Sequence, residues 1–268
     1  MGAAVHLGRR DHLIHATVEG PRTGTLPVVL VHGVCFGPET FERPAAALAR
    51  RVRVITPHRR GYGESAHLPP GESVDEHVDD LVRVLARLGV SRGVFVGVSG
   101  GATITLATAM SHPDLVAAAV IHEPAIGPLA PGVHGILSTG AGMVAQAADA
   151  GDGAEAMAAL LAGGSWGAQG FAERARIRDR GCVVRHEVPG FLAFAPSIAD
   201  LRRLRAIPVV SSVGSLSRAQ RMAAAQILAE HAGARLEVVR GAGHLLQLDA
   251  PAVLARCALR QRRQVMAA

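Results

Sequence analysis

The chain has 268 residues, of which 49% are hydrophobic and 19% charged, so the composition supports a large buried core and excludes a disordered chain. The formal net charge is +6, and because the sequence contains no lysine, every basic residue except histidine is arginine. The arginines gather only near the C-terminus, and so short a cluster does not predict a nucleic-acid partner. We interpret it as a solvated helix end, with an anionic partner as the alternative. The cluster consists of Arg256, Arg260, Arg262 and Arg263.

Cysteine usage and hydropathy indicate the cellular compartment that we expect for this protein. Three cysteines at irregular spacing, Cys35, Cys182 and Cys257, predict neither a disulfide framework nor a zinc site. No run of 18 uninterrupted apolar residues occurs, so we expect no membrane span. Residues 1–15 lack the apolar stretch of a signal peptide. We therefore expect a cytoplasmic protein that binds no metal and needs no cofactor, and we leave open whether it forms a homodimer.

Strand and helix patterns alternate along the chain. Residues 12–20 alternate in polarity and predict an early antiparallel strand. The continuous β-branched run at 27–33 predicts a strand that is buried on both faces. The alternation of such strands with helices predicts an α/β fold with a doubly wound, mostly parallel sheet. Further strands are expected at 52–56, 93–98, 115–123, 207–214 and 235–241, and helices at 39–50, 73–89, 101–111, 218–231 and 251–263.

The helix expected at 73–89 carries signals at both ends. Ser73, followed three residues later by Glu76, predicts a capping box in which each side chain accepts a hydrogen bond from the other residue's backbone N–H. Gly89 predicts the C-terminal end, because glycine readily adopts the left-handed conformation that is common there.

One long interval, residues 124–206, interrupts the alternation. It is rich in Ala and Gly, contains no convincing buried strand and has short helical patterns such as 153–163. Unstructured segments of this length are uncommon inside a domain, so we predict a helical cap inserted into the fold. The expected organisation is a core domain of residues 1–123 and 207–268, with the cap formed by residues 124–206.

Residues 94–107, VFVGVSGGATITLA, place a serine between glycines where a predicted strand passes into a predicted helix. Gly97-Val98-Ser99-Gly100-Gly101 satisfies the G-x-S-x-G pattern, in which a nucleophilic serine sits on a sharp, strained turn. A side chain at Gly97 or Gly101 would collide with the adjoining strand or helix. We therefore predict that Ser99 is a nucleophile.

The chain resembles α/β-hydrolase-fold serine hydrolases in four landmarks that follow one another in the family's order: VHGVCFGPETF at 31–41, RRGYGES at 59–65, GVSGG at 97–101 and GAGHLLQLDAP at 241–251. The resemblance covers nearly the whole chain and is least specific in the predicted cap. It implies that the backbone N–H groups of Val34 and Gly100 form an oxyanion hole, and that His244 is the general base.

The acid of a catalytic triad is missing from its usual place. Many relatives carry an aspartate shortly after the penultimate strand, but residues 209–229 contain no Asp or Glu, and Ser217 occupies the expected position. A hydroxyl cannot supply the negative charge that stabilises a histidine cation. Glu123 ends the strand that follows the nucleophile helix, a position from which members resembling zearalenone hydrolase take their acid. We predict the triad Ser99, His244 and Glu123; a carboxylate that only caps the entrance to the cap is the alternative for Glu123.

Six residues are candidates for the substrate pocket. His58 stands where relatives commonly have aspartate, and Cys35 follows the predicted oxyanion residue as a reactive thiol or a small apolar filler. We expect the side chain of His32 to be structural. The aromatic residues of the predicted cap either line an apolar pocket or hold the cap together. The candidates are His32, Cys35, His58, Trp166, Phe191 and Phe194.

These features predict a cofactor-independent serine hydrolase that cleaves a small carboxylic ester or lactone through an acyl-enzyme. A serine nucleophile argues against epoxide hydrolase and dehalogenase chemistry. Thioester or C–C cleavage, acyl transfer, and lyase or cyclase chemistry with the same triad remain alternatives, because fold alone does not determine the reaction. A ligand-binding protein that retains the triad without turnover is a further alternative, which the absence of the standard aspartate permits.

Overall fold

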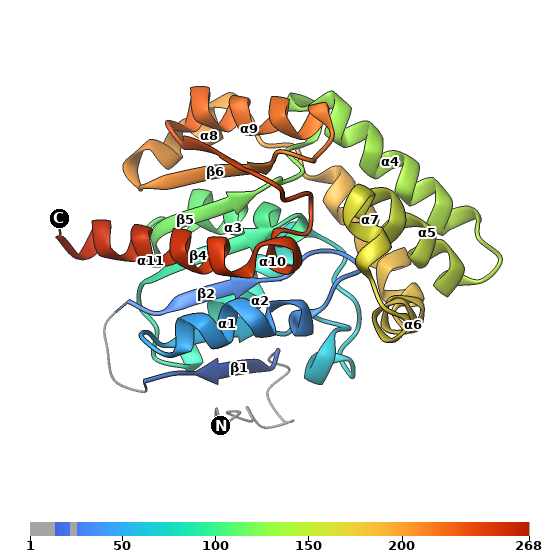
Figure 1. The fold of residues 1–268 in the computed structure, drawn as a ribbon, viewed down its shortest axis with the longest axis horizontal. Helices are drawn as coiled ribbons and strands as arrows, with labels where there is room; N and C mark the ends of the chain where they lie inside the picture. The colour runs from blue at the N-terminus through green and yellow to red at the C-terminus, as the bar shows by residue number, and fades with distance from the viewer. Residues whose placement is uncertain (1–13, 22–25, 268) are drawn as a thin grey trace.

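A seven-stranded sheet forms the centre of the molecule, which a computed structural model describes over residues 14–21 and 26–267 (Figure 1). The strand order is β1-β3-β2-β4-β5-β6-β7; β1 is antiparallel to β3, and all other neighbours are parallel. The predicted doubly wound, mostly parallel sheet is therefore confirmed. Residues 12 and 13 of the first predicted strand lie outside the described residues. The strands are β1 (Ala16–Glu19), β2 (Val28–Val31), β3 (Val54–Pro57), β4 (Gly93–Val98), β5 (Val116–His122), β6 (Val209–Gly214) and β7 (Arg235–Val239).

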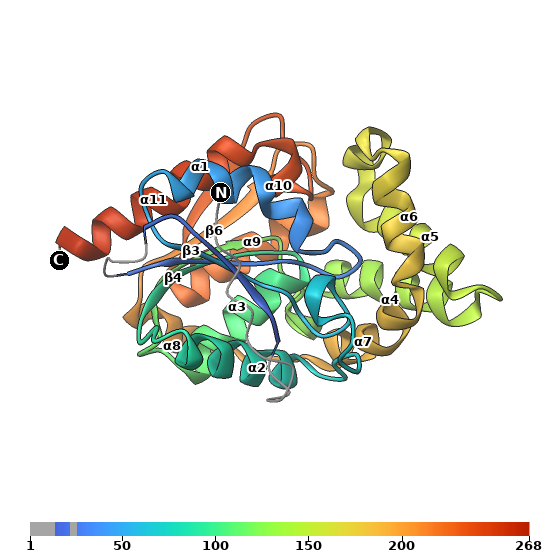
Figure 2. The same cartoon turned by 90° about the horizontal axis from the view of Figure 1, so that it is seen from below.

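Helices cover both faces of the sheet (Figures 1 and 2). One face is covered by α1 and α11, and the other by α2, α3, α8 and α9. Every residue of β2 to β6 is buried between these layers, which explains the continuous apolar sequences of β2 and β4. Within the described ranges, no helix is long and apolar enough to cross a bilayer. The helices are α1 (Glu42–Ala49), α2 (Val74–Arg87), α3 (Gly100–Ser111), α8 (Ile198–Arg203), α9 (Ala219–Ala232), α10 (Leu246–Asp249) and α11 (Pro251–Ala267).

The interval predicted as a cap is helical. Between β5 and β6 the chain, all of it described, contains no strand. Four of its helices gather beside one end of the sheet, away from the layers on its two faces (Figures 1 and 2). We refer to these four helices as the cap helices. They are α4 (Pro131–Gln146), α5 (Ala150–Ala162), α6 (Phe171–Asp179) and α7 (Gly181–Ala193).

The ends of α2 agree with the sequence signals only in part. Ser73 Oγ accepts a hydrogen bond from the Glu76 N–H (3.1 Å), as predicted. The Glu76 carboxylate, however, accepts from the backbone N–H of Glu72 (2.9 Å) and contacts Arg60 Nη1 (3.3 Å), so the reciprocal half of the capping box does not form. Gly89 follows the helix with φ = +68°, the left-handed conformation that was expected of it.

Strand register brings the predicted catalytic residues to one edge of the sheet. Val98 pairs with His122 across β4 and β5, so Ser99 and Glu123 leave two neighbouring strands at the same level. The Ser99 N–H donates to the His122 carbonyl (2.9 Å), and the Glu123 N–H donates to the Ser212 carbonyl on β6 (3.3 Å). The carboxyl ends of the parallel strands therefore build the site, as is usual for open α/β sheets.

A close backbone approach joins α7 to the start of α2, and it yields a stability prediction. A β-carbon at Gly190 would lie 2.2 Å from the Glu72 carbonyl oxygen, so Gly190→Ala should lower the free energy of unfolding by about 1–3 kcal/mol. Gly135 in α4 has open space around it, and Gly135→Ala should raise that free energy by about 0.5–1 kcal/mol. Urea unfolding of both variants checks this. Equal effects of the two substitutions would contradict it.

Candidate active site

Ser99 occupies a strained turn between β4 and α3. Its backbone has φ = +57° and ψ = −123°, a conformation that non-glycine residues rarely adopt. A β-carbon at Gly97 would lie 2.2 Å from the Gly101 carbonyl oxygen, and one at Gly101 would lie 2.0 Å from the Val31 carbonyl oxygen. The two glycines are thus required by close backbone contacts, for the reason that the sequence pattern predicted.

Ser99 lines a cavity of about 30 Å³ between the sheet edge and the cap helices. This volume has room for about one water molecule. The cap side of the cavity is apolar, whereas the sheet side carries the polar groups. The lining residues are Val34, Ser99, Gly100, Glu123, Ala125 and Arg221 from the sheet side, and Val133, Ile136, Leu137, Leu161 and Phe191 from the cap helices.

Two backbone donors border the same cavity. Val34 and Gly100 both line it, and within the described part of the chain neither N–H has a hydrogen-bond acceptor. A β-carbon at Gly100 would lie 3.2 Å from the Val34 nitrogen, so the two residues are close neighbours. Gly100 is also the first residue of α3, where the helix dipole favours negative charge. This geometry suits the oxyanion hole predicted for these two N–H groups.

Glu123 and His244 form a buried pair behind Ser99. His244 Nδ1 donates to Glu123 Oε2 (2.7 Å), and Glu123 Oε1 accepts from the Gly214 N–H at the end of β6 (2.9 Å). Glu123 is 1% exposed and has φ = +52°, so it is the second strained residue of the site. The penultimate strand thus donates a backbone N–H to a carboxylate that belongs to β5. Ser217, at the position where relatives carry the acid, has a buried hydroxyl with no partner among the described residues.

The loop that carries His244 is held by contacts on both of its sides. Asp249 Oδ2 accepts from the Gly243 N–H (2.8 Å), and His122 Nε2 donates to the Gly243 carbonyl (3.3 Å). A β-carbon at Gly214 would lie 2.3 Å from the Ala242 carbonyl oxygen, so glycine allows β6 to approach this loop. These contacts bring the imidazole to the Glu123 carboxylate.

Electrostatics keep the acid charged and the base neutral. Burial by itself raises the pKa of Glu123, but His122, His244 and Arg221 together hold that pKa well below its usual range. Arg221 Nε lies 3.3 Å from Glu123 Oε2. Burial, together with the charge of Arg221, lowers the pKa of His244 to about 4 against the opposing effect of Glu123. His244 is therefore neutral at pH 7, with its proton on Nδ1 and a free lone pair on Nε2.

The structure brings Ser99, Val34, Gly100, Glu123 and Phe191 together around one cavity. His244 joins them through its hydrogen bond to Glu123. No hydrogen bond links Ser99 Oγ to His244 within the described residues, and such bonds often tighten only when substrate is bound.

Other candidates lie outside the cavity lining. The His32 ring accepts from the Arg59 N–H (3.2 Å) and donates to the Phe36 carbonyl (3.0 Å), which is the structural role expected of it. His58 accepts from the Glu64 N–H (3.1 Å) and lines a separate groove.

Cys35 is fully buried, and burial raises the pKa of its thiol, so the filler interpretation fits it better than a reactive thiol. Trp166 lies in a 3-10 helix (Gly163–Ala168) between α5 and α6, and the Arg174 guanidinium stacks on its ring at 4.7 Å. Phe194 packs at the edge of the main hydrophobic core.

Sequence reasoning missed Arg221 and His122. Arg221 is 4% exposed, and its Nη2 donates to the Leu161 carbonyl of α5 (3.3 Å) while its Nε contacts Glu123. In a chain whose basic residues are all arginine, nothing in the local sequence distinguishes it. His122 directly precedes Glu123, and this adjacency was the only feature of the sequence that could have pointed to a role for His122 in the site. Among the described residues, no group of three or more His, Cys, Asp or Glu side chains could hold a metal ion.

A comparison with known protein families identifies the family of this chain. The sequence profile described as the alpha/beta hydrolase family matches residues 28–256. A Caulobacter segnis protein with the provisional name carbamate hydrolase RutD is 38% identical over 97 residues, which are 35% of this chain and 36% of that protein. The aligned segment thus spans little more than a third of this relative.

Solved structures match over nearly the full length. A thermophilic esterase from Thermogutta terrifontis aligns with a TM-score of 0.76 and 24% identity, over 94% of this chain and 93% of that one. Est816, described as an N-acyl homoserine lactone degrading enzyme, aligns with a TM-score of 0.72 and 25% identity, over 92% and 95%. An enol-lactonase from Burkholderia xenovorans aligns with a TM-score of 0.74 and 20% identity, over 93% and 96%.

Buried neutral histidines make stability depend on pH. Burial lowers the pKa of His58 and of His244 to about 4, whereas an unfolded histidine titrates near 6.5. Between these values the unfolded state binds protons that the folded state does not, so stability falls as the pH decreases from about 6.5 to 4. Each such histidine contributes about 1.4 kcal/mol per pH unit.

Urea unfolding at pH 7 and pH 5 measures this slope. His58→Gln should reduce the slope relative to wild type, with the exposed His67→Gln as the matched control. A free energy of unfolding that stays constant between pH 7 and pH 5 would show that these histidines titrate alike in the folded and the unfolded state, which contradicts a lowered pKa.

Proposed function

We propose a function for this chain, which belongs to the alpha/beta hydrolase family of enzymes. The proposed function is that of a serine hydrolase which cleaves a carboxylic ester or lactone through an acyl-enzyme. The observation that carries the proposal is the 2.7 Å hydrogen bond between His244 Nδ1 and Glu123 Oε2, beside the strained turn of Ser99. The names of the esterase and the lactone-degrading enzyme with similar structures support the choice of substrate class.

The reaction begins with the neutral imidazole. His244 Nε2 takes the hydroxyl proton of Ser99, whose Oγ attacks the substrate carbonyl carbon. Negative charge then develops on the carbonyl oxygen, and the N–H groups of Val34 and Gly100 stabilise it. The imidazolium, stabilised by the Glu123 carboxylate, gives its proton to the leaving alkoxide as the C–O bond breaks. A lactone follows the same course, with the alkoxide remaining attached to the acyl group.

The second half of the reaction restores the serine. His244 Nε2 takes a proton from water, whose oxygen attacks the acyl carbonyl, and the same two N–H groups bind the second oxyanion. The imidazolium returns its proton to Ser99 Oγ as the acyl–serine bond breaks, and a carboxylic acid leaves. Because the cap side of the cavity is apolar, we expect the group that it covers to be apolar as well.

Carbamates form a second candidate substrate class. The Caulobacter segnis relative that is 38% identical over 97 residues is provisionally named a carbamate hydrolase. A carbamate carbonyl forms the same type of tetrahedral intermediate as an ester, so the chemistry requires no different residues. A substrate panel should therefore contain esters, lactones and carbamates with matched acyl and leaving groups.

The first test is intact-mass spectrometry after treatment with a fluorophosphonate, which reacts with activated serines. Wild type should gain one adduct, and Ser99→Ala should gain none. Glu123→Gln should react about 10³-fold more slowly, because the histidine loses the charge that stabilises its protonated form. Glu155→Gln on α5, which lies outside the cavity lining, is the matched control and should react like wild type.

Two outcomes would oppose the proposal. A folded wild type that gains no adduct, and that cleaves no member of the panel, would remove the serine hydrolase assignment. Fast labelling of Glu123→Gln would keep the hydrolase and place the catalytic acid elsewhere.

The acid limit of activity should depend on Arg221. Since kcat/KM requires neutral His244, its acid limb should lie near pH 4, the pKa to which burial and Arg221 lower the imidazole. Arg221→Gln removes a cation that opposes protonation, so the limb should move to higher pH. Arg218→Gln, an exposed neighbour at the start of α9, is the matched control. The pH–rate profiles, recorded in brief assays after a pH jump, test this; an unchanged limb in Arg221→Gln would contradict it.

A further inference from the structure

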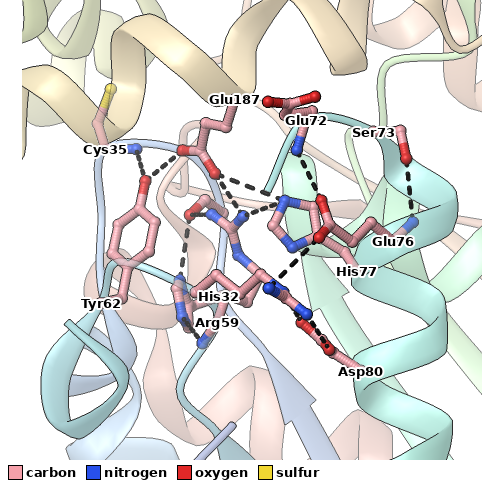
Figure 3. A network of polar contacts seen from close by, with 12 residues as sticks. His32, Cys35, Arg59, Tyr62, Glu72, Ser73, Glu76, His77, Asp80 and Glu187 are labelled. Atoms are coloured by element: carbon pink, nitrogen blue, oxygen red, sulfur yellow. Dashed lines mark hydrogen bonds and ion pairs between the residues drawn. The ribbon is translucent and has the colours of Figure 1, made fainter. Parts of the chain in front are cut away.

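A carboxylate on a cap helix lies at the centre of a buried polar network (Figure 3). Glu187 belongs to α7, and its side chain is 0% exposed. Its Oε2 accepts from Arg59 Nη1 (2.6 Å), and its Oε1 accepts from the Tyr62 hydroxyl. Arg59 and Tyr62 both lie on the segment that follows β3, so this one residue connects a cap helix to the core through two different partners.

Arg59 extends the network to the loop that carries Val34. Its Nη2 donates to the Gly33 carbonyl (2.6 Å) while its Nη1 holds Glu187. The Gly33 carbonyl and the Val34 N–H belong to the same peptide unit, which is planar and trans, so they point in opposite directions. The Arg59 guanidinium, together with His32 Nδ1 at 3.1 Å from the same carbonyl oxygen, therefore constrains the direction of the Val34 N–H. A cation on the carbonyl oxygen also polarises that N–H and strengthens it as a donor.

Tyr62 holds the next peptide unit of the same loop. Its hydroxyl accepts from the Cys35 N–H (3.2 Å) and donates its own proton to Glu187. Cys35 has φ = +67°, a conformation that a non-glycine residue adopts only when its surroundings impose it. The peptide units on both sides of Val34 are thus fixed by side chains that Glu187 itself fixes.

We propose that Glu187 is a positioning residue, which through Arg59 and Tyr62 aims the Val34 N–H at the oxyanion, so that the oxyanion hole is complete only while α7 is docked. The proposal rests on the proposed function, since it assigns Val34 as an oxyanion donor. It joins two roles of the cap helices: they cover the substrate, and they complete the catalytic machinery below it.

Stability alone does not explain the network. A buried ion pair gains little over well-packed apolar side chains, because both charges lose their hydration. Here Arg59 also donates to the Gly33 carbonyl, and Tyr62, which donates to Glu187, accepts from the Cys35 N–H. Gly33 and Cys35 are the two neighbours of Val34. A structural role would be served equally by a contact elsewhere on α7.

Steady-state kinetics with p-nitrophenyl esters test the effect on catalysis. Glu187→Gln keeps the side-chain shape and removes the charge; its kcat should fall about 10- to 100-fold while KM changes by less than about threefold. Glu187→Asp should recover part of the loss. The preference for an ester over the matching thionoester should also weaken, because an oxyanion hole binds oxygen better than sulfur.

The matched control lies on the same helix. Arg185→Gln removes hydrogen bonds to the Val144 and Ala147 carbonyls within the cap helices and touches none of the residues around Val34. It should leave kcat within about twofold of wild type. Equal losses in Arg185→Gln and Glu187→Gln would overturn the proposal, because they would indicate a general loosening of the cap helices.

A substrate-independent measurement separates this proposal from the proposed function. In NMR spectra of ¹⁵N-labelled protein, the Val34 and Cys35 amides should shift in Glu187→Gln, and the Cys35 amide, which donates to Tyr62, should exchange at least about tenfold faster than in wild type. A wild type without hydrolase activity would remove the proposed function, and the amide data would still decide whether Glu187 positions Val34. Unchanged amides and unchanged kcat in Glu187→Gln would overturn the positioning role alone.

Tyr62→Phe keeps the test decisive if Glu187→Gln does not fold. It leaves the ion pair between Arg59 and Glu187 in place and removes the hydroxyl that accepts from the Cys35 N–H and donates to Glu187. We expect a loss in kcat of about 3- to 10-fold with faster Cys35 amide exchange. Wild-type values for both would overturn the proposal.

Discussion

The hydrogen bond between Glu123 and His244 is the interaction on which the rest of the site depends. It spans 121 residues of sequence and joins the end of β5 to a loop beyond β7, so it exists only if β5, β6 and β7 lie side by side in register. Two features of β6 make it reachable. The Gly214 N–H holds one carboxylate oxygen, and the missing β-carbon of Gly214 lets the histidine loop approach. In many relatives the strand that corresponds to β6 is followed by the catalytic acid. In this protein β6 instead donates a hydrogen bond to Glu123, which follows the neighbouring strand β5.

Charge balance explains why a carboxylate can be buried at this point. An isolated ionised Glu123 would be costly in an apolar interior, yet the charge of Arg221 and the hydrogen bonds from neutral His244 and from the Gly214 N–H favour its charged form. Arg221 has the opposite effect on His244, whose pKa it lowers. Arg221 thus contributes both to the charged state of the acid and to the neutral state of the base, which are the two protonation states that the proposed mechanism requires at pH 7.

The sequence was sufficient where the determining contacts are local. β-branched runs predicted the buried strands, and the glycines around Ser99 predicted the strained turn, because each signal acts within a few residues. Only one of the two hydrogen bonds of the α2 capping box is present, the one from the Glu76 N–H to Ser73 Oγ. The Glu76 carboxylate instead binds Arg60 and the Glu72 N–H. Glu123 was predicted as the acid because the usual acid position holds no Asp or Glu. The contact between Arg59 and Glu187 spans 128 residues of sequence. No local pattern in the Ala- and Gly-rich segment 124–206 predicts such a contact.

The cap helices therefore contribute to this molecule in two physically different ways. Val133, Leu137 and Phe191 present apolar surface to the cavity, which discriminates between substrates by shape and hydration. Glu187 acts on charge and hydrogen-bond direction at the opposite wall. Because Glu187 and Phe191 lie one turn apart on α7, any shift of this helix changes substrate contact and oxyanion geometry together. Substrate contact and the geometry of the proposed oxyanion hole are therefore coupled through one helix.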